Sequence, residues 1–133
     1  MKRNRRLLLK TAKRIEKIPE SYDQKHWATD SSSSPCGTAA CLAGELIICS
    51  ARSVRAGVTL LRNRYTLPDF ISTPHMASKL AGLTEEEANK LFPEDVDEWP
   101  AQFRKRYVTA KTKQDRANAA AALLRYLAAG GAV

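Results

Sequence analysis

The stretch Cys36-Gly37-Thr38-Ala39-Ala40-Cys41-Leu42-Ala43-Gly44 decides how the rest of this chain is interpreted. It consists mainly of small residues and leads into the most apolar segment of the sequence, Leu46-Ile47-Ile48-Cys49. A helix that is apolar on nearly every side is buried, and small side chains let neighbouring backbones approach it closely. We therefore predict a buried central helix over residues 38–51. Glu45 is its exceptional polar residue and needs a partner or access to the surface.

On the N-terminal side of this stretch, apolar residues recur at helical spacing and predict a helix over residues 4–18. Pro19 ends that helix, because proline cannot donate a backbone hydrogen bond. Residues 19–27 have no helical period and predict an extended connector, whose Tyr22 and Trp27 could pin it to the core. Residues 29–35 are polar and predict a mobile loop.

On the C-terminal side, helix-boundary signals predict further helices and no convincing strand. A short helix is expected after Arg52, followed by a loop after Arg64. The other signals are Pro74 to Ala81 closed by Gly82, a capping box from Thr84 to Glu87, an aromatic stripe of Trp99, Phe103 and Tyr107 behind Pro100, and an alanine-rich helix from Lys113 to Ala128. Aromatic residues at that spacing favour a core position. The chain is predicted to be one all-α domain of five to seven helices around the central one.

Charge is the largest global signal, because the chain carries a net charge of +8 and distributes it unevenly. Residues 1–18 hold eight basic residues against Glu16 alone, whereas residues 69–98 are acidic. Residues 1–6 are predicted to form a free basic arm, and a second basic cluster lies at 104–106. The predicted nucleic-acid-binding residues are Arg3, Arg5, Arg6, Lys10, Lys13, Arg104, Lys105 and Arg106.

These basic residues predict a partner class rather than a partner. No pattern in the sequence is typical of base reading, so contact with nucleic acid would be mostly through phosphates and independent of sequence. An acidic protein surface is the alternative partner for the same charges. We interpret the chain as a small non-enzymatic binding or regulatory module; nothing in the sequence indicates its oligomeric state.

A cysteine hydrolase is the competing interpretation. Papain-like enzymes place a Cys-Gly pair at the start of a central helix of small residues, where the helix dipole lowers the pKa of the thiol. Cys36-Gly37 resembles that arrangement, with Gln24 as the oxyanion donor and His75 as the base. No strands follow to build the sheet that carries the histidine in such enzymes. We therefore expect Cys36 to be structural.

Metal, cofactor and membrane functions are not predicted. A metal site would combine His26, Cys36, Cys41 and His75, but the Cys-x4-Cys interval is looser than in most zinc sites. With three cysteines, any disulfide scheme leaves one unpaired, and we expect all three to be reduced. No apolar run approaches the roughly 20 residues of a membrane-spanning helix. These features favour a cytoplasmic protein.

Three motifs together resemble a group of small uncharacterised proteins from bacteria and their phages. The motifs are a Trp-Asp-Gln-like segment, seen here as Tyr22-Asp23-Gln24 with Trp27; Cys-Gly-Thr-x-x-Cys-x-Ala-Gly, at 36–44; and a Leu-Gly-Leu-Thr-like segment running from Leu80 to Phe92. The chain departs from the group at Glu45, where tryptophan is usual, and in the long 52–70 insertion. The resemblance spans roughly residues 8–130. It implies a helical fold and a bacterial or phage origin, and it implies no activity.

Overall fold

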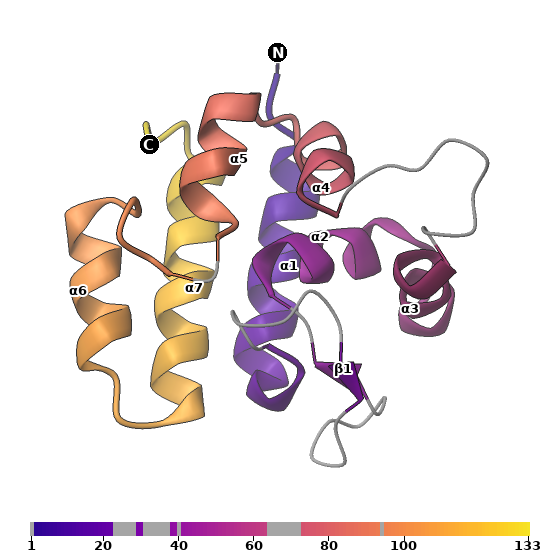
Figure 1. The fold of residues 1–133 in the computed structure, drawn as a ribbon, viewed down its shortest axis with the longest axis horizontal. Coiled ribbons are helices and arrows are strands. Elements are labelled where there is room, and N and C mark those ends of the chain that lie inside the picture. The colour runs from indigo at the N-terminus through magenta and orange to yellow at the C-terminus, as the bar shows by residue number, and fades with distance from the viewer. Residues whose placement is uncertain (1, 23–28, 31–37, 40, 64–72, 94) are drawn as a thin grey trace.

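Seven α-helices make up most of the described chain, and they pack into one compact all-α domain (Figure 1). The computed structural model describes residues 2–22, 29–30, 38–39, 41–63, 73–93 and 95–133. The helices are α1 (Arg5–Lys17), α2 (Leu42–Ser50), α3 (Val54–Asn63), α4 (Thr73–Ala81), α5 (Glu85–Leu91), α6 (Ala101–Thr109) and α7 (Lys113–Ala128). The predicted fold class and number of helices are confirmed.

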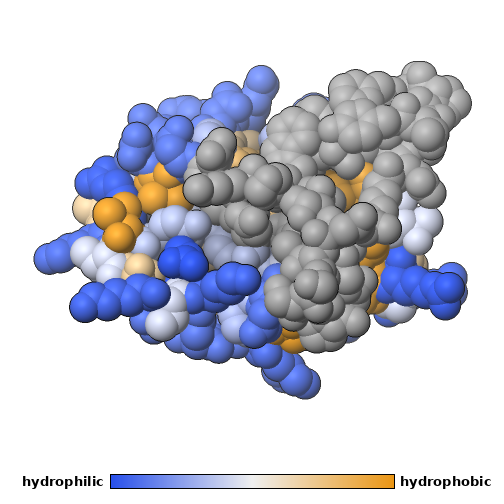
Figure 2. Space-filling model, turned by 60° about the horizontal axis from the view of Figure 1, so that its bottom comes forward, coloured by the Kyte–Doolittle hydropathy of each residue, from blue (hydrophilic) through white to orange (hydrophobic). Residues whose placement is uncertain are grey.

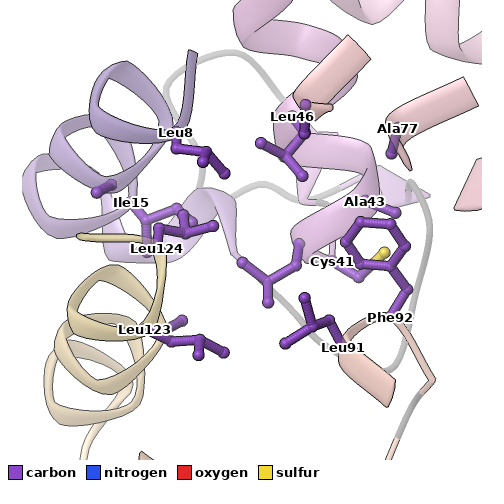
Figure 3. Packing of buried hydrophobic residues seen from close by; sticks show 14 of the residues in the cluster. Leu8, Ile15, Cys41, Ala43, Leu46, Ala77, Leu91, Phe92, Leu123 and Leu124 are labelled. Carbon is purple, nitrogen blue, oxygen red and sulfur yellow. The ribbon is translucent and has the colours of Figure 1, made fainter. Parts of the chain in front are cut away.

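Helix α2 is the centre of the domain, as predicted. Every residue from Leu42 to Cys49 is buried, and α1, α3 and α4 pack against this helix. Figure 3 shows Leu8 and Ile15 of α1 and Leu124 of α7 converging on the same core as Leu46. Helix α1 packs in turn against α7, and α7 against α6. The apolar contacts therefore run continuously from one end of the molecule to the other.

The central helix begins later than the predicted residue 38. Cys41 is its N-cap residue with an extended backbone, and the first helical residue is Leu42. Thr38 and Ala39 instead form strand β2 (Thr38–Ala39), which pairs antiparallel with β1 (Thr29–Asp30). Pairing with residues 29–30 provides hydrogen bonds for the peptide groups of Thr38 and Ala39, so these two residues do not need the hydrogen bonds of the helix. Of the predicted mobile loop 29–35, residues 31–35 lie outside the described part of the chain.

The prediction of a free basic arm over residues 1–6 is wrong. Arg5 and Arg6 already belong to α1, and the Asn4 side chain caps this helix by accepting from the Leu7 amide at 3.1 Å. The backbone amide of Asn4 donates to the Ala81 carbonyl at 2.8 Å. The Arg3 guanidinium donates to the carbonyls of Leu127 and Gly131 and pairs with Glu87. Arg3 therefore ties the N-terminus to the ends of other elements, because it supplies several donors in one planar group.

The connector after α1 is partly different from the extended segment predicted. Pro19–Ser21 forms a turn of 3₁₀ helix, η1, rather than extended chain. Tyr22 follows and is buried, which agrees with its predicted role in pinning the segment to the core. Trp27 and the remainder of this segment, residues 23–28, lie outside the described residues.

The boundary signals of the C-terminal half are confirmed. Gly82 follows α4 with a φ of 70°, a conformation in which glycine avoids the steric cost of a side chain. Thr84 and Glu87 form both hydrogen bonds of the capping box that opens α5. Thr112 caps α7 by accepting from the Asp115 amide at 3.0 Å. Local hydrogen bonds and backbone sterics explain these helix boundaries.

The aromatic stripe lies in the core, as predicted. Trp99 is 2 % exposed, and its indole nitrogen donates to the Leu91 carbonyl at 3.0 Å. Phe103 is buried against Tyr126, with ring centroids 5.1 Å apart. Tyr107 is partly buried and meets the edge of Trp99 at 5.2 Å. These rings pack α6 onto α7 and are not a stacking surface for a ligand.

Gly57, which by propensity weakens a helix, is explained by the packing of α3 on α2. A Cβ atom built at this position would lie 2.2 Å from the Ile48 carbonyl oxygen and 2.6 Å from the Ile48 Cα atom. Both obstructing atoms belong to the backbone of α2, so no rotation of a side chain can relieve the clash. The absence of a side chain at Gly57 therefore sets how closely α3 approaches the central helix.

We predict that Gly57→Ala destabilises the protein by about 1–3 kcal/mol, although alanine favours helix formation. The two helices must move apart, which loosens the contacts of Ile48 with its neighbours. Urea denaturation followed by circular dichroism measures the change. Ala56→Leu, an enlargement at the adjacent exposed position of α3, is the matched control and should leave stability nearly unchanged. Equal stability of Gly57→Ala and the parent would contradict this packing of α3.

Candidate functional site

Four basic residues of α1 form one exposed stripe, which we call the α1 stripe: Arg6, Lys10, Lys13 and Lys17. Their spacing of four, three and four residues keeps them within about 60° of one another around the helix axis. The stripe is about 16 Å long, from the rise per residue of an α-helix. The opposite side of α1 carries the buried Leu8, Ala12 and Ile15, so packing of the core directs the stripe outwards.

The α1 stripe borders two adjoining hollows, which together we call the groove. The first, of about 370 Å³, lies between α1 and the corner that joins α2 to α3; its lining includes Lys10, Lys13, Lys17, Ile48, Arg52 and Val54. The second, of about 380 Å³, is lined by Asn4, Arg6, Leu7, Lys10, Cys49, Ser50 and Leu80. Lys10 and Cys49 line both hollows, so the two hollows adjoin at these residues.

The groove has cationic walls and a partly apolar floor. Arg52, exposed on the side opposite α1, adds a fifth positive charge to the α1 stripe. Ile18, Ile48, Ala51 and Val54 supply apolar surface in the first hollow. No carboxylate occurs among the described residues that line either hollow. Such a surface attracts an anion over its whole length, and Ser53 at the start of α3 adds the positive end of a helix dipole.

Lys10 sits where the two hollows meet. Its ammonium group donates to the Cys49 carbonyl oxygen at the C-terminal end of α2, at 2.9 Å. This bond leaves two ammonium protons for an anion in the groove. It also joins α1 to the end of the central helix, so Lys10 has a structural contact as well as a position for binding.

A buried ion pair lies beneath the groove. Arg14 lines the first hollow, and its Nε atom donates to Glu45 Oε2 at 2.9 Å. Glu45 is fully buried on α2, and its Oε1 atom has no hydrogen-bond partner among the described residues. The sequence prediction that Glu45 needs a partner is thus confirmed. Burial raises the pKa of Glu45 to about 7, and the charge and hydrogen bond of Arg14 only partly oppose this effect.

The second predicted basic cluster lies elsewhere. Arg104, Lys105 and Arg106 are exposed on α6, which packs against α7 at the end of the molecule opposite α3 (Figure 1). Arg104 donates to the Asp97 carbonyl at 2.9 Å. Helices α1 and α7 separate this cluster from the α2–α3 corner. The two predicted clusters therefore do not line one groove.

Of the predicted binding residues, the structure brings Arg6, Lys10 and Lys13 together. Arg3 is engaged in contacts between the chain ends, and Arg5 is exposed but does not line either hollow. The sequence prediction did not include two residues that line the groove, Lys17 and Arg52. Lys17 could have been found, because it follows Lys13 by one helical turn. Arg52 could not, because its place across the groove depends on how α2 and α3 pack.

On the face shown in Figure 2, the described residues form no broad apolar surface that could be a binding site in place of the groove. The described residues visible on that face are mainly hydrophilic, with small hydrophobic areas between charged residues. The exposed large hydrophobic side chains of the described residues are Leu9, Val54, Leu60 and Val108. Only Val54 of these belongs to the groove.

Of the three residues of the hydrolase interpretation, the structure describes His75 alone. His75 is exposed in the first turn of α4. Cys36 and Gln24 lie outside the described residues, and α2 begins six positions after Cys36. Cys41 is the cysteine that starts the helix, and burial raises the pKa of its thiol to about 11 despite hydrogen bonds from nearby amides. Burial also raises the pKa of Cys49. Both described thiols are therefore neutral near pH 7 and poor nucleophiles.

The described residues present neither a metal-binding cluster nor a membrane-spanning helix. They contain no group of three or more histidine, cysteine or acidic side chains arranged to hold a metal ion. None of their helices is both long enough and apolar enough to cross a bilayer. Cys41 and Cys49 form no disulfide.

Comparison with known proteins adds no assignment to this geometry: no family model, curated protein or solved structure matches the chain.

We predict that the buried Glu45 makes stability depend on pH. Its folded pKa of about 7 exceeds its ordinary value of 4.5, so the folded state binds the proton more tightly between these values. The free energy of unfolding should therefore fall as pH rises from about 4.5 to 7, an effect that Glu45→Gln removes. Urea denaturation at several pH values measures it.

Glu16→Gln is the control for this prediction, because Glu16 is a partly exposed carboxylate that pairs with Arg125 at the surface. It should retain the fall in stability between pH 4.5 and 7. If Glu45→Gln had the same pH dependence as the parent, the buried carboxylate would not be the titrating group.

Proposed function

We propose that this protein is a small non-enzymatic binding module that holds the phosphate backbone of nucleic acid in the groove beside α1. Five exposed cations carry the proposal: the α1 stripe and Arg52, which line the two adjoining hollows of the groove without an acidic residue among the described lining. Each cation that neutralises a phosphate releases condensed counterions, and this release drives association. A groove of one charge sign also speeds encounter with a polyanion.

The chemistry of the lining favours contact with phosphates over contact with base edges. Three of the five cations are lysines, which act as point charges rather than as planar, bidentate readers. Asn4 is the amide in the lining, and both ends of its side chain are occupied, since it accepts from the Leu7 amide and donates to the Leu80 carbonyl. Base-specific recognition normally uses such amides or bidentate arginines. We therefore expect little dependence on sequence.

The origin and location proposed for this module rest on the sequence. The Cys-Gly-Thr-x-x-Cys-x-Ala-Gly motif supports our proposal that this chain belongs with the small bacterial and phage proteins that carry it and acts in the cytoplasm of a bacterium. Helix α2 begins within the motif at Leu42, and its buried Ala43 and Gly44 fit a structural role, because small residues allow close packing. An acidic protein is the other partner that these charges would attract, and binding experiments decide between the two.

We predict that fluorescently labelled nucleic acid binds with a strong salt dependence. If four or five phosphates are neutralised, the logarithm of the association constant should fall with the logarithm of salt concentration, with a slope of about −3 to −4. Fluorescence anisotropy between about 50 and 200 mM salt measures this slope. Scrambling the sequence of the oligonucleotide should change the affinity little.

The triple variant Arg6→Ala/Lys13→Ala/Lys17→Ala should weaken binding at least about tenfold at low salt and make the slope shallower by about 2 to 3. The matched control removes the same charge from α6: Arg104→Ala/Lys105→Ala/Arg106→Ala. It should retain most of the affinity, because these residues lie away from the groove. Equal losses in the two variants would indicate a general charge effect. Absence of binding at about 50 mM salt would reject nucleic acid and favour an acidic protein partner.

A further inference from the structure

We propose that the nucleic acid held by the groove is single-stranded, and that the first hollow takes an unstacked base while the α1 stripe holds the flanking phosphates. This inference rests on the function proposed above and names its substrate class. It comes from the one feature of the groove that phosphate binding does not explain, which is the apolar floor between its cationic walls.

The apolar floor is well defined. Ile18, Ile48, Ala51 and Val54 line the first hollow together with the lysines of α1 and with Arg52. Ile48 is 2 % exposed and thus forms the bottom, whereas Val54 is 37 % exposed at the opening. A sugar-phosphate backbone has no large apolar group to place there, so a ligand that offered only phosphates would leave this surface uncovered.

A single strand fits both parts of the groove. In a duplex the bases are stacked and paired, and mainly phosphates would reach the cationic walls. A single strand has unpaired bases, each with an apolar face that gains by leaving water. Burial of one base against Ile48 and Val54 would bring its flanking phosphates to Lys13 and Lys17 on α1 and to Arg52 on the opposite wall.

The dimensions are compatible with this arrangement. The first hollow, at about 370 Å³, falls within the size range of pockets that hold small organic ligands. The second hollow continues the groove past Lys10 to Arg6, so the strand would meet a cation at each turn of α1. The residues described around the two hollows include no aromatic side chain. Without aromatic stacking, the preference for a single strand should be modest and should tolerate any base.

The experiment compares three labelled polyanions of equal length at the same salt concentration: a single-stranded oligonucleotide, the corresponding duplex, and an abasic strand with the same phosphates. We expect the single strand to bind about three- to tenfold more tightly than the abasic strand, which lacks the group that covers the apolar floor. The duplex should also bind more weakly than the single strand. Equal affinities for the single and abasic strands would overturn the inference and leave phosphate binding intact.

Val54→Thr tests the floor without changing charge and with little change in shape. It should weaken binding of the single strand about two- to threefold and leave binding of the abasic strand unchanged. Val108→Thr is the matched control, since Val108 is a 68 % exposed valine on α6. Circular dichroism establishes that both variants are folded, and Val54→Ala provides a second variant of the floor with the same expected result.

Three results bear on this inference and on the function on which it rests. Failure of all three polyanions to bind would reject the proposed function itself. Tighter binding of a synthetic acidic peptide with alternating leucine and glutamate than of the single strand would also overturn the inference, because the floor would then serve the apolar side chains of a protein. Loss of single-strand preference in Val54→Thr, with the salt dependence retained, would support it.

Discussion

The structure depends on the burial of α2 on all sides. Eight of the nine residues of α2 are buried, so this helix would expose apolar side chains to water at the surface of a domain. Helices α1, α3 and α4 cover it instead. The helices approach α2 closely where a side chain is absent. Gly57 of α3 shows this most directly, because the Ile48 backbone occupies the space where a Cβ atom would lie. The exception to the apolar pattern, Glu45, is held by Arg14 of α1. This ion pair opposes rotation of α1 against α2, because rotation would leave a charge buried without a partner.

The groove is a consequence of this packing. The apolar side of α1 faces the core, so the stripe from Arg6 to Lys17 faces outwards, beside the corner where α2 ends and α3 begins. Arg14 lies at the boundary between the two sides and reaches inwards to Glu45. The cations that remain in the walls are exposed and strongly hydrated. These cations attract a polyanion over a long range, and salt weakens their contacts with it.

The positive charge of this protein therefore has several roles rather than one. Arg3 joins the N-terminus to the ends of α5 and α7, Arg14 neutralises a buried carboxylate, and Lys10 holds the last turn of α2. Lys10 keeps two further ammonium protons, so the whole α1 stripe and Arg52 face a ligand in the groove. An interpretation based on net charge would have overstated the binding surface. The acidic residues at the start of α5 belong to another element, and among the described residues none of them lines the groove.

The sequence by itself determined the helices and their order. Capping residues, prolines and glycines act through local hydrogen bonds and backbone sterics, so Asn4, Thr84 and Thr112 mark the starts of helices whatever lies around them. The small and apolar stretch after Cys41 likewise determined that α2 is buried. Only the tertiary structure decided that Thr38 and Ala39 form a strand, that Arg3 binds within the fold, and that Arg52 faces Lys13 and Lys17 across one groove. The reason is physical: these outcomes depend on contacts between residues far apart in the chain, which composition and periodicity do not encode.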